Sequence, residues 1–299
     1  MSGAAPGAPG QQPATYRLQP IQSRHREASR QMILRVAEEV SPARAIVLGA
    51  GPCDEIPVVE LATRFSELVL NDIDPRTVST ALDTLEIDEI ARAKIRCDAA
   101  DLTGATEPAL ARVDAALSTA GEAHQALDAM AAALAGQPAV GLTLAGPWAT
   151  GSCDLVVASC LLSQLHFHLA HGAAARFEAC YPGQGELLRK SEAWTRSLDE
   201  LARRIEGRFV EDLAQLVAPG GRVYLSESVQ MCYVTRVADG GWTSPGTYRM
   251  LQTKDLADYV RGKFTVVERD RWEWVVNAPA KTGDVGRLFD VQALVLARQ

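Results

Sequence analysis

The chain has 299 residues, of which 47% are hydrophobic and 22% are charged. This balance excludes a mostly disordered chain, because enough apolar side chains are present to bury a core. The length is that of one large domain, or of one domain that carries insertions. The formal net charge of −7 disfavours a general nucleic-acid binder, which needs a basic surface.

The first segment, residues 1–15, is rich in Gly, Ala, Pro and Gln and is predicted to be a disordered tail. It lacks the basic and long apolar regions of a signal peptide. The longest uncharged run lies between Asp128 and Asp154 and consists mostly of small residues, so we expect no membrane span. The six cysteines form no C-x-x-C pair, which argues against a zinc or dithiol site. We therefore expect reduced thiols and a cytoplasmic protein.

Hydrophobic periodicity predicts the elements in chain order. Residues 16–42 have apolar positions at helical spacing and are predicted to form an N-terminal helical lid. Short apolar runs predict buried strands at 45–48, 67–70, 93–97, 155–159 and 222–226. Helical patterns lie at 55–63, where Asp54 is the expected N-cap, and at 76–90, 104–135, 163–217 and 253–261. Two final β-branched runs, 264–276 and 289–297, predict an antiparallel hairpin.

Strands that alternate with helices predict an α/β fold with a doubly wound, mostly parallel sheet. In such folds, ligands bind beyond the carboxyl ends of the strands. The first candidates for a site are therefore the residues that follow the predicted strands. They are the glycine turn at 49–51, Asp72, Asp98, Ser159 and Glu227.

The turn after the first strand indicates a nucleoside ligand. Gly49 and Gly51 allow a ligand to approach the backbone, and Asp72 closes the next strand, where it can accept from ribose hydroxyls. A dinucleotide fingerprint would have its last glycine at the position of Asp54, and Asp54 and Glu55 would repel a diphosphate. They would not repel the ammonium and sulfonium groups of S-adenosylmethionine (SAM). The absence of a lysine after the loop excludes a P-loop.

With these motifs the chain resembles the class I (Rossmann-like) SAM-dependent methyltransferases. The resemblance extends over residues 45–299 as an order of elements, and five short motifs carry it: IVLGAGPCDE, LVLNDIDP, CDAADL, CDLVVASCLLSQL and LVAPGGRVYLSES. It implies a seven-stranded sheet with a C-terminal antiparallel hairpin, formed by residues 43–299. It also implies helical insertions around 104–150 and 163–208, because these stretches exceed the compact core of the family.

The resemblance implies SAM as cofactor and S-adenosyl-L-homocysteine (SAH) as product. It places Asp72 in the ribose slot, Asp98 at the exocyclic amine of adenine, and Ala99 beside the ring. The complete expected set of cofactor-binding residues is Gly49, Ala50, Gly51, Pro52, Asp72, Ile73, Asp98, Ala99 and Ser159.

The chemistry of methyl transfer requires chiefly that the two reactants are aligned, and a base is needed only if the acceptor must lose a proton. Candidate bases are His166, His168 and His171, of which His166 lies nearest the end of the fourth strand. Glu227 is a second catalytic candidate, for orienting an acceptor hydroxyl or amine. The spacing of the histidines is poor for a metal site, and we expect no metal.

Aromatic residues are the candidates for binding the acceptor. Tyr16 belongs to the N-terminal lid, and a predicted substrate loop at 230–252 contains Tyr233, Trp242 and Tyr248 among glycines. Such a loop suits a flat organic molecule. His168 is the remaining candidate for contact with the substrate.

The sequence therefore predicts a methyltransferase that acts on an oxygen or nitrogen of a small molecule. RNA or protein methylation is an alternative, as are a non-catalytic SAM-binding scaffold and a NAD-dependent dehydrogenase. The residues at 159–162 are Ser-Cys-Leu-Leu, so they contain neither the Pro-Pro motif of amino-group nucleic-acid methyltransferases nor a Pro-Cys nucleophile. Basic residues between 176 and 204 alternate with acidic ones, as on a solvated face. The acceptor and the oligomeric state stay open.

Overall fold

The computed structural model describes residues 15–16, 21–142, 149–238, 242–243, 249–250, 255–276 and 281–299. Within these residues, seven strands of four or more residues form the main sheet, in the order β4-β3-β2-β5-β6-β10-β9. Their bounds are β2 (Arg44–Leu48), β3 (Glu67–Asn71), β4 (Ile95–Asp98), β5 (Cys153–Ser159), β6 (Val217–Arg236), β9 (Phe264–Val276) and β10 (Val285–Arg298).

The sheet is mostly parallel and ends in an antiparallel hairpin. Neighbours from β4 to β6 pair in parallel, whereas β10 is antiparallel to both β6 and β9. The predicted fold class is confirmed. The sheet also contains three two-residue strands, β1 (Thr15–Tyr16), β7 (Trp242–Thr243) and β8 (Arg249–Met250). Both β7 and β8 pair with β6, and β1 pairs with β7.

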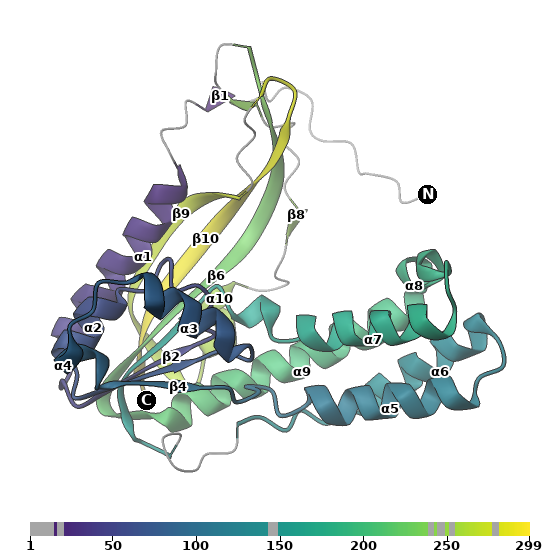
Figure 1. The fold of residues 1–299 in the computed structure, drawn as a ribbon, viewed down its shortest axis with the longest axis horizontal. Helices are drawn as coiled ribbons and strands as arrows, with labels where there is room; N and C mark the ends of the chain where they lie inside the picture. Colours follow the sequence, from purple (N-terminus) through teal and green to yellow (C-terminus); the bar gives the residue numbers. More distant parts are fainter. Residues whose placement is uncertain are drawn as a thin grey trace.

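Helices cover both faces of the sheet, because its central strands are apolar on both sides. One core cluster joins the sheet to α1 (Ile21–Glu38), α2 (Val58–Arg64), α3 (Pro75–Thr84) and α4 (Glu89–Arg92). The other joins it to α5 (Thr106–Thr119), α6 (Ala123–Ala135), α7 (Phe167–Cys180), α9 (Glu192–Leu216) and α10 (Leu256–Val260). Figure 1 shows this arrangement.

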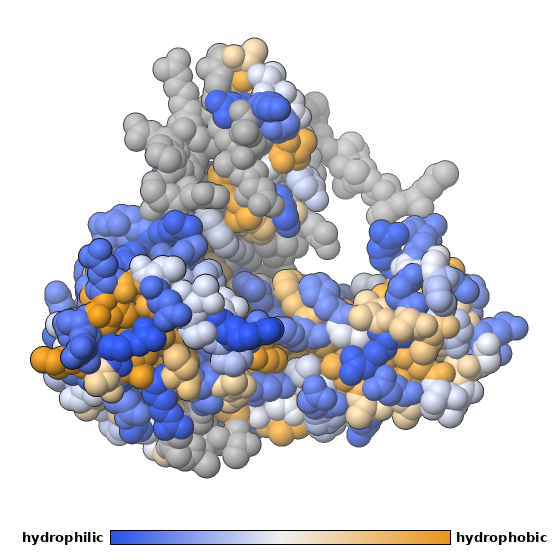
Figure 2. Space-filling model, viewed as in Figure 1, coloured by the Kyte–Doolittle hydropathy of each residue, from blue (hydrophilic) through white to orange (hydrophobic). Residues whose placement is uncertain are grey.

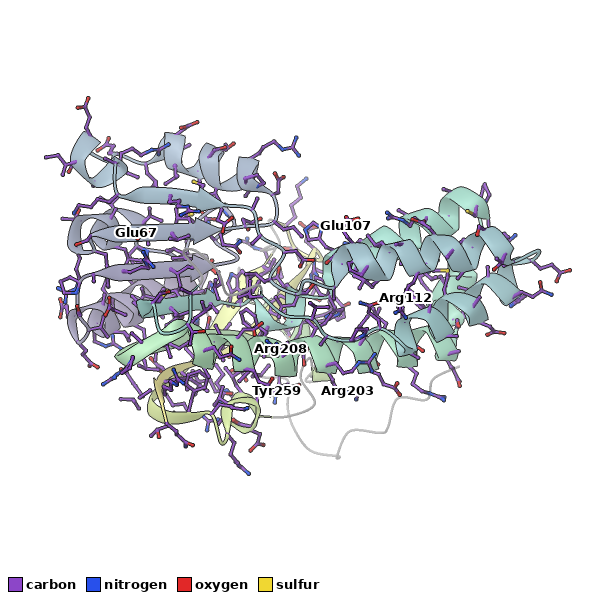
Figure 3. All side chains as sticks on the ribbon, turned by 90° about the horizontal axis from the view of Figure 1, so that it is seen from below. Glu67, Glu107, Arg112, Arg203, Arg208 and Tyr259 are labelled. Atoms are coloured by element: carbon purple, nitrogen blue, oxygen red, sulfur yellow. The ribbon has the colours of Figure 1, made fainter. Side chains whose placement is uncertain are left out.

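The segments expected as insertions contain a helical lobe, which we define as α5, α6, α7, α8 (Gly185–Lys190) and the adjoining part of α9. The lobe projects to one side of the sheet (Figures 1 and 3). Its helices are joined by polar contacts as well as by the core. Arg176 of α7 pairs with Asp114 of α5 at 2.9 Å, and the Arg204 guanidinium donates to the Leu134 carbonyl at 3.2 Å.

The fifth strand is much longer than predicted. The apolar run predicts a strand that ends at 226 and the glycines predict a loop at 230–252, but β6 continues to Arg236. The continuation pairs with β10 and has its own small core, formed by Cys232, Val234, Val275 and Leu288. Cross-strand burial therefore stabilises a strand where the nearby glycines indicated a loop. In Figure 1, β6, β9 and β10 rise together above the body of the molecule.

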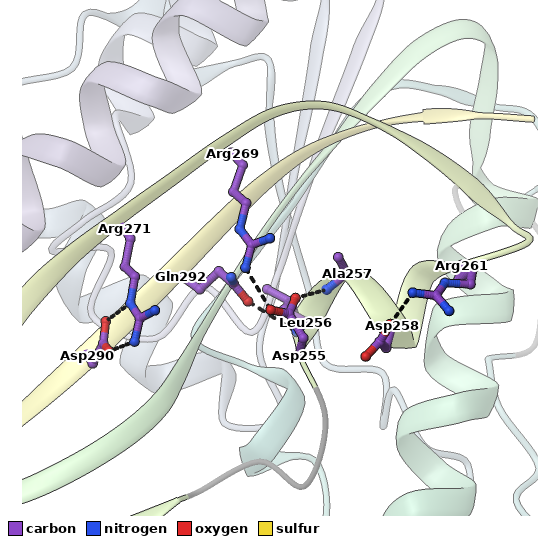
Figure 4. Close-up of polar contacts among 9 residues, drawn as sticks. All are labelled: Asp255, Leu256, Ala257, Asp258, Arg261, Arg269, Arg271, Asp290 and Gln292. Carbon is purple, nitrogen blue, oxygen red and sulfur yellow. Dashed lines mark hydrogen bonds and ion pairs between the residues drawn. The ribbon is translucent and has the colours of Figure 1, made fainter. Parts of the chain in front are cut away.

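The helix α10 is fixed against the hairpin by polar contacts (Figure 4). Its N-cap, Asp255, accepts from the Ala257 N–H at 2.9 Å and from Arg269 at 2.7 Å. The Leu256 N–H donates to the buried Gln292 side chain of β10 at 3.1 Å. The prediction of a helix at 253–261 is confirmed for its central part, and residues 253 and 254 lie outside the described residues.

Hydrophilic residues occupy most of the described surface on the face shown in Figure 2. None of the helices in the described ranges is both long enough and apolar enough to cross a membrane.

Candidate functional site

A cavity of about 480 Å³ lies beyond the carboxyl ends of β2, β3 and β5. Its wall contains the turn after β2, the end of β3, the start of the segment that leads to α5, the residues after β5, the first turn of α7, and Trp274 of β9. This is the place where a doubly wound sheet is expected to bind its ligand.

The glycine turn exposes backbone to the cavity. Gly49 and Gly51 have φ values of +62° and +51°. A Cβ atom at Gly49 would lie 2.5 Å from a terminal methyl group of Leu161, which would have to move, and the positive φ favours glycine at this position. A Cβ atom at Gly51 would meet no protein atom within 4 Å, so that glycine is required by its φ angle alone. Both residues, which were expected to bind the cofactor, line the cavity together with Ala50 and Pro52.

Asp72 connects β3 to the glycine turn. One of its carboxylate oxygens accepts from the Gly51 N–H at 2.9 Å, and the other accepts from the Asp74 N–H at 2.9 Å. Each oxygen can accept a further hydrogen bond, and both Asp72 and Ile73 line the cavity. The neighbouring carboxylate, Asp74, instead caps α3 by accepting from the Arg76 N–H at 3.1 Å.

The wall near β4 differs from the expectation. Asp98 and Ala99 are not among the lining residues, whereas Ala100, Asp101 and Leu102 are. The lining residues lie further along the chain than expected because Asp98 still belongs to the strand pairing. Its carbonyl accepts from the Asp72 N–H at 3.1 Å. The chain then turns toward the cavity one or two residues later than the motif suggested.

Asn71 is a lining residue that the sequence analysis did not select. Its amide nitrogen donates to the Ala100 carbonyl at 3.0 Å, while its Oδ1 atom is buried without a hydrogen-bond partner. An unpartnered buried acceptor is costly unless a ligand supplies a donor. The signal in the sequence was an amide at the end of an otherwise apolar strand.

Glu55 also lines the cavity, although the sequence analysis used it only to argue about charge. Burial raises the pKa of its carboxyl group, and a hydrogen bond from the Ser159 side chain opposes this shift. The Nε2 atom of His25, on α1, lies 3.8 Å from a Glu55 oxygen. Burial, followed by the nearby Arg26, lowers the pKa of His25 to about 4, so this imidazole is neutral at physiological pH.

The turn after β5 forms the opposite wall. Ser159, a residue expected to bind the cofactor, lines the cavity, and its hydroxyl lies 3.2 Å from that of Ser226. Cys160 has a φ of +46°, and its N–H donates to the Ser226 carbonyl at 3.0 Å. Burial raises the pKa of the Cys160 thiol well above its usual value, which keeps the group protonated and poorly nucleophilic.

Glu227, selected as a catalytic candidate, lies outside the cavity wall and is fully buried. Its carboxylate accepts from the Ser163 N–H at 2.9 Å, from the Ser163 hydroxyl at 2.8 Å and from the Ser228 N–H at 2.8 Å. These bonds hold the 3₁₀ turn η2 (Leu162–Gln164) against β6. The geometry therefore gives Glu227 a supporting position beneath the loop.

The three candidate histidines separate into two groups. His166 precedes α7 and is not among the lining residues, its Nδ1 atom is buried without a partner, and burial lowers its pKa. His168 and His171 line the cavity together with Phe167, which is 45% exposed. The structure thus brings His168, rather than His166, to the site.

The aromatic substrate candidates are not part of the described cavity. Tyr233 lies on β6 and is 55% exposed, away from the lining residues. Tyr16 and Trp242 are described only as paired positions of β1 and β7, and Tyr248 lies outside the described residues. An aromatic residue that was not selected, Trp274, occupies the wall instead. In the described part of the chain, no three His, Cys, Asp or Glu side chains are grouped so as to hold a metal ion.

Comparison with known proteins gives no family model and no curated protein that matches the chain. Solved structures do match. A SAM-dependent methyltransferase from Leishmania major is 13% identical, with 93% of this chain and 73% of that chain covered and a TM-score of 0.40. A second structure is 14% identical and comes from work on the conversion of a disulfide bond into a thioacetal group during echinomycin biosynthesis. The match covers 90% of this chain and 80% of that chain, with a TM-score of 0.39.

A glycopeptide N-methyltransferase solved with SAM is 11% identical, with 89% of this chain and 93% of that chain covered and a TM-score of 0.37. At these identities and TM-scores, the likeness carries no argument about this chain. The order of the strands, the antiparallel β10 and the cavity at the carboxyl ends of β2, β3 and β5 are features of the chain itself. By these features, the chain has a doubly wound, mostly parallel α/β sheet that ends in an antiparallel hairpin.

Proposed function

We propose that the chain is a SAM-dependent methyltransferase that transfers a methyl group to an oxygen or nitrogen of a small-molecule acceptor and releases SAH. One observation carries the proposal. A single cavity is lined by a glycine turn whose backbone is open to a ligand and by four acidic residues, Asp54, Glu55, Asp72 and Asp101. Asp72 suits the hydroxyls of a ribose, and Glu55 suits a cation.

The residues present fit this cofactor better than a dinucleotide. A diphosphate would have to lie near Asp54 and Glu55, which are both acidic. Asn71 offers a buried acceptor without a partner, and the adenosine end would lie against Ile73 and Leu102. The cofactor, when bound, supplies a methyl group on a positively charged sulfur.

The protein contributes positioning and exclusion of water. The hydrogen bonds of Asp72 hold the glycine turn in place, and those of Glu227 hold the turn after β5. Two opposite walls of the cavity are therefore fixed before a ligand binds, and such preorganisation lowers the entropic cost of aligning the reactants. Trp274 and Phe167 provide apolar surface at the same site.

If the acceptor is a hydroxyl, we propose that His168 receives its proton. His168 and His171 line the cavity, whereas His166 does not, and of the two His168 lies nearer the end of β5 in the sequence. We expect His168→Ala to lower kcat by ~10²-fold, the usual contribution of a general base. The same substitution at His166 is the control and should leave kcat within about threefold. A larger loss from His166→Ala would restore that residue as the base. Turnover measured across pH distinguishes the two variants.

The proposal is tested first by binding and then by transfer. Titration calorimetry should show SAH bound at micromolar levels and NADH not bound. Incubation with SAM carrying an isotopically labelled methyl group, together with a cell extract, should then give labelled small molecules by mass spectrometry. Binding of NADH instead would contradict the assignment. Binding of SAH without any transfer would support a non-catalytic scaffold.

RNA or protein methylation remains an outcome of the same transfer experiment. Three of the basic residues between 176 and 204 form ion pairs with acidic side chains. Arg176 pairs with Asp114 at 2.9 Å, and Arg189 and Lys190 both pair with Glu186. Label recovered in RNA would favour this alternative over a small-molecule acceptor.

A further inference from the structure

The hairpin of β9 and β10 continues the wall of the cavity outward. Trp274 of β9, which lines the cavity, lies directly opposite Phe289 of β10, and their ring centroids are 5.7 Å apart. Side chains two residues apart on a strand point to the same face of a sheet. The next row on this face, toward the connection between β9 and β10, therefore consists of Val276, Arg287 and Tyr233.

This row is open to solvent, in the part of β6, β9 and β10 that rises above the body of the molecule (Figure 1). Gly286 and Leu288 are buried and point to the other face, where Leu288 belongs to a small core, whereas Arg287 is exposed. Tyr233, directly opposite Arg287 on β6, is also exposed. Arg287 is the diagonal neighbour of Trp274, and such neighbours lie ~7–8 Å apart, within reach of a long side chain. A ligand that extends from the cavity past Trp274 would thus meet Arg287.

Arg287 is a cation without a counter-charge in the part of the chain that the structure describes. Its guanidinium forms no ion pair or hydrogen bond with another described side chain. Glu273 and Asp290, the acidic residues nearest to it in the strand register, lie on the opposite face with Leu288, and Asp290 pairs with Arg271. A guanidinium holds five donors in a planar fork that matches a carboxylate. Arg287 is therefore available to bind an anion from a ligand.

The charges of the cavity determine which end of an acceptor can lie in it. The described residues of its wall include four acidic side chains and neither lysine nor arginine. SAM adds two positive groups and one negative group, so the occupied site would still be negative. An anionic group is repelled from such a site and attracted to Arg287 outside it. The acceptor should then present an uncharged or basic atom to the cavity and an anion to the hairpin.

We propose that Arg287 is a specificity-determining residue that binds the carboxylate of an aromatic acceptor, whose ring lies on the sheet face between Trp274 and Tyr233. The inference rests on the proposed function and names its acceptor class, an aromatic carboxylic acid methylated at a hydroxyl or amino group remote from the acid. The acceptor atom bonds to the methyl carbon and loses one proton, and the electrons of the broken carbon–sulfur bond stay on the sulfur of SAH. A carboxylate matches the single cation of this described row, whereas a phosphate dianion would keep one charge unpaired.

The charge of the methylated product tests the class of acceptor. The full chain is incubated with SAM that carries an isotopically labelled methyl group and with a small-molecule extract, and the labelled products are passed over an anion exchanger. A carboxylic acid is retained at about pH 7 and released at about pH 2, where a phosphate or sulfate ester stays charged. We expect the label in products that the acid releases. Label only in products that are retained at both pH values, or at neither, would overturn the inference.

Variants then test recognition at Arg287, with the acceptor identified by its mass. Arg287→Gln should raise the KM of the acceptor by ~10–100-fold, the scale of a lost hydrogen bond to a charged group, and leave the affinity for SAH within about twofold. Arg287→Lys keeps the charge without the planar fork and should give an intermediate KM. Arg298→Gln, the matched control, removes an exposed arginine at the other end of β10 and should change neither value.

The amide of the same acceptor separates binding of the carboxylate from support of the hairpin. It keeps the ring but lacks the charge, so the unaltered protein and Arg287→Gln should methylate it with similar KM values. Equal increases in KM for the acid and the amide would show that Arg287 only supports the hairpin, and an unchanged KM for the acid would remove its role. Tyr233→Ala should raise KM for both compounds by ~3–10-fold, and unchanged values would remove the contact with the ring.

Failure of this inference is distinct from failure of the proposed function. If the unaltered chain binds SAH but labels no molecule in the extract, the proposed methyl transfer fails and the acceptor site fails with it. If it labels only neutral or basic molecules, the methyl transfer stands and the carboxylate site at Arg287 fails.

Discussion

Glu206, in the middle of α9, is 6% exposed, and burial raises the pKa of its carboxyl group to about 7. A hydrogen bond from Tyr259 opposes this shift. The unfolded chain releases this proton near pH 4.5, so the folded state binds more protons between pH 4.5 and 7. The free energy of unfolding therefore falls as pH rises through this window.

Glu206→Gln removes this titration and should alter the pH dependence of stability. As the pH rises from 5 to 8, the natural protein should lose about 2–3 kcal/mol of unfolding free energy through this carboxyl group, and the variant should not show this loss. Urea unfolding at the two pH values measures the difference. The same substitution at Glu200, which is more exposed on the same helix, is the matched control. An identical pH dependence in Glu206→Gln and the natural protein would show that the carboxyl group is not protonated when folded.

The two carboxylates after β3 offer a second test at the scale of residues. Asp72→Ala removes a cavity carboxylate and should weaken SAH binding by ~1–3 kcal/mol, measured by calorimetry. Asp74→Ala removes the cap of α3, so it should lower the stability slightly and leave the affinity unchanged. A loss of affinity in Asp74→Ala alone would mean that the ribose partner was assigned to the wrong residue.

At the scale of elements, the start of α5 depends on Asp101. Its carboxylate accepts from the Thr103 N–H at 2.9 Å, the Thr103 hydroxyl at 2.8 Å and the Thr106 N–H at 3.2 Å. Asp101→Ala should therefore lower the unfolding free energy by ~1–2 kcal/mol in denaturant titration. Asp88→Ala, which removes the single cap bond of the short α4, is the comparison and should cost less. An equal or smaller loss from Asp101→Ala would contradict the capping role.

The element boundaries show where local sequence was sufficient. The bounds of β2, β3 and β5, the strands that lead into the cavity, agree with the prediction to within one or two residues. Near-continuous apolar runs bounded by Gly, Asp or Asn indicate such buried strands. The helix expected at 55–63 instead begins at Val58, after Pro57, and Asp54 does not cap it. Asp54 pairs with Arg26 of α1, a partner that no local pattern reveals.

At the scale of the whole molecule, the cavity draws its walls from strands in the centre of the sheet. A ligand bound there should stabilise the whole folded state. SAH at about one hundred times its Kd should add ~2.7 kcal/mol, which corresponds to a rise of roughly 4–8 °C in Tm. Thermal unfolding with and without SAH measures this, and NADH at the same concentration is the control. An unchanged Tm with SAH would contradict binding at the cavity.

The α/β architecture, the glycine turn and the position of Asp72 could be predicted from the sequence, because each depends on residues that are neighbours along one strand and its following turn. The same local logic placed the end of β5 and Ser159 in the wall. The motif after β4 led us to expect Asp98 at the site, whereas residues 100–102 line the cavity. A motif does not show where the chain turns after its strand pairing ends.

The contacts between elements that are distant in the sequence arise from tertiary packing. His25 and Trp272, 247 residues apart in the chain, form one buried hydrogen bond beside Glu55. The packing of α7 turns His168 toward the cavity and leaves His166 outside it. These contacts depend on how helices and strands pack after they form, and a pattern in a single sequence carries information about the elements but not about their docking.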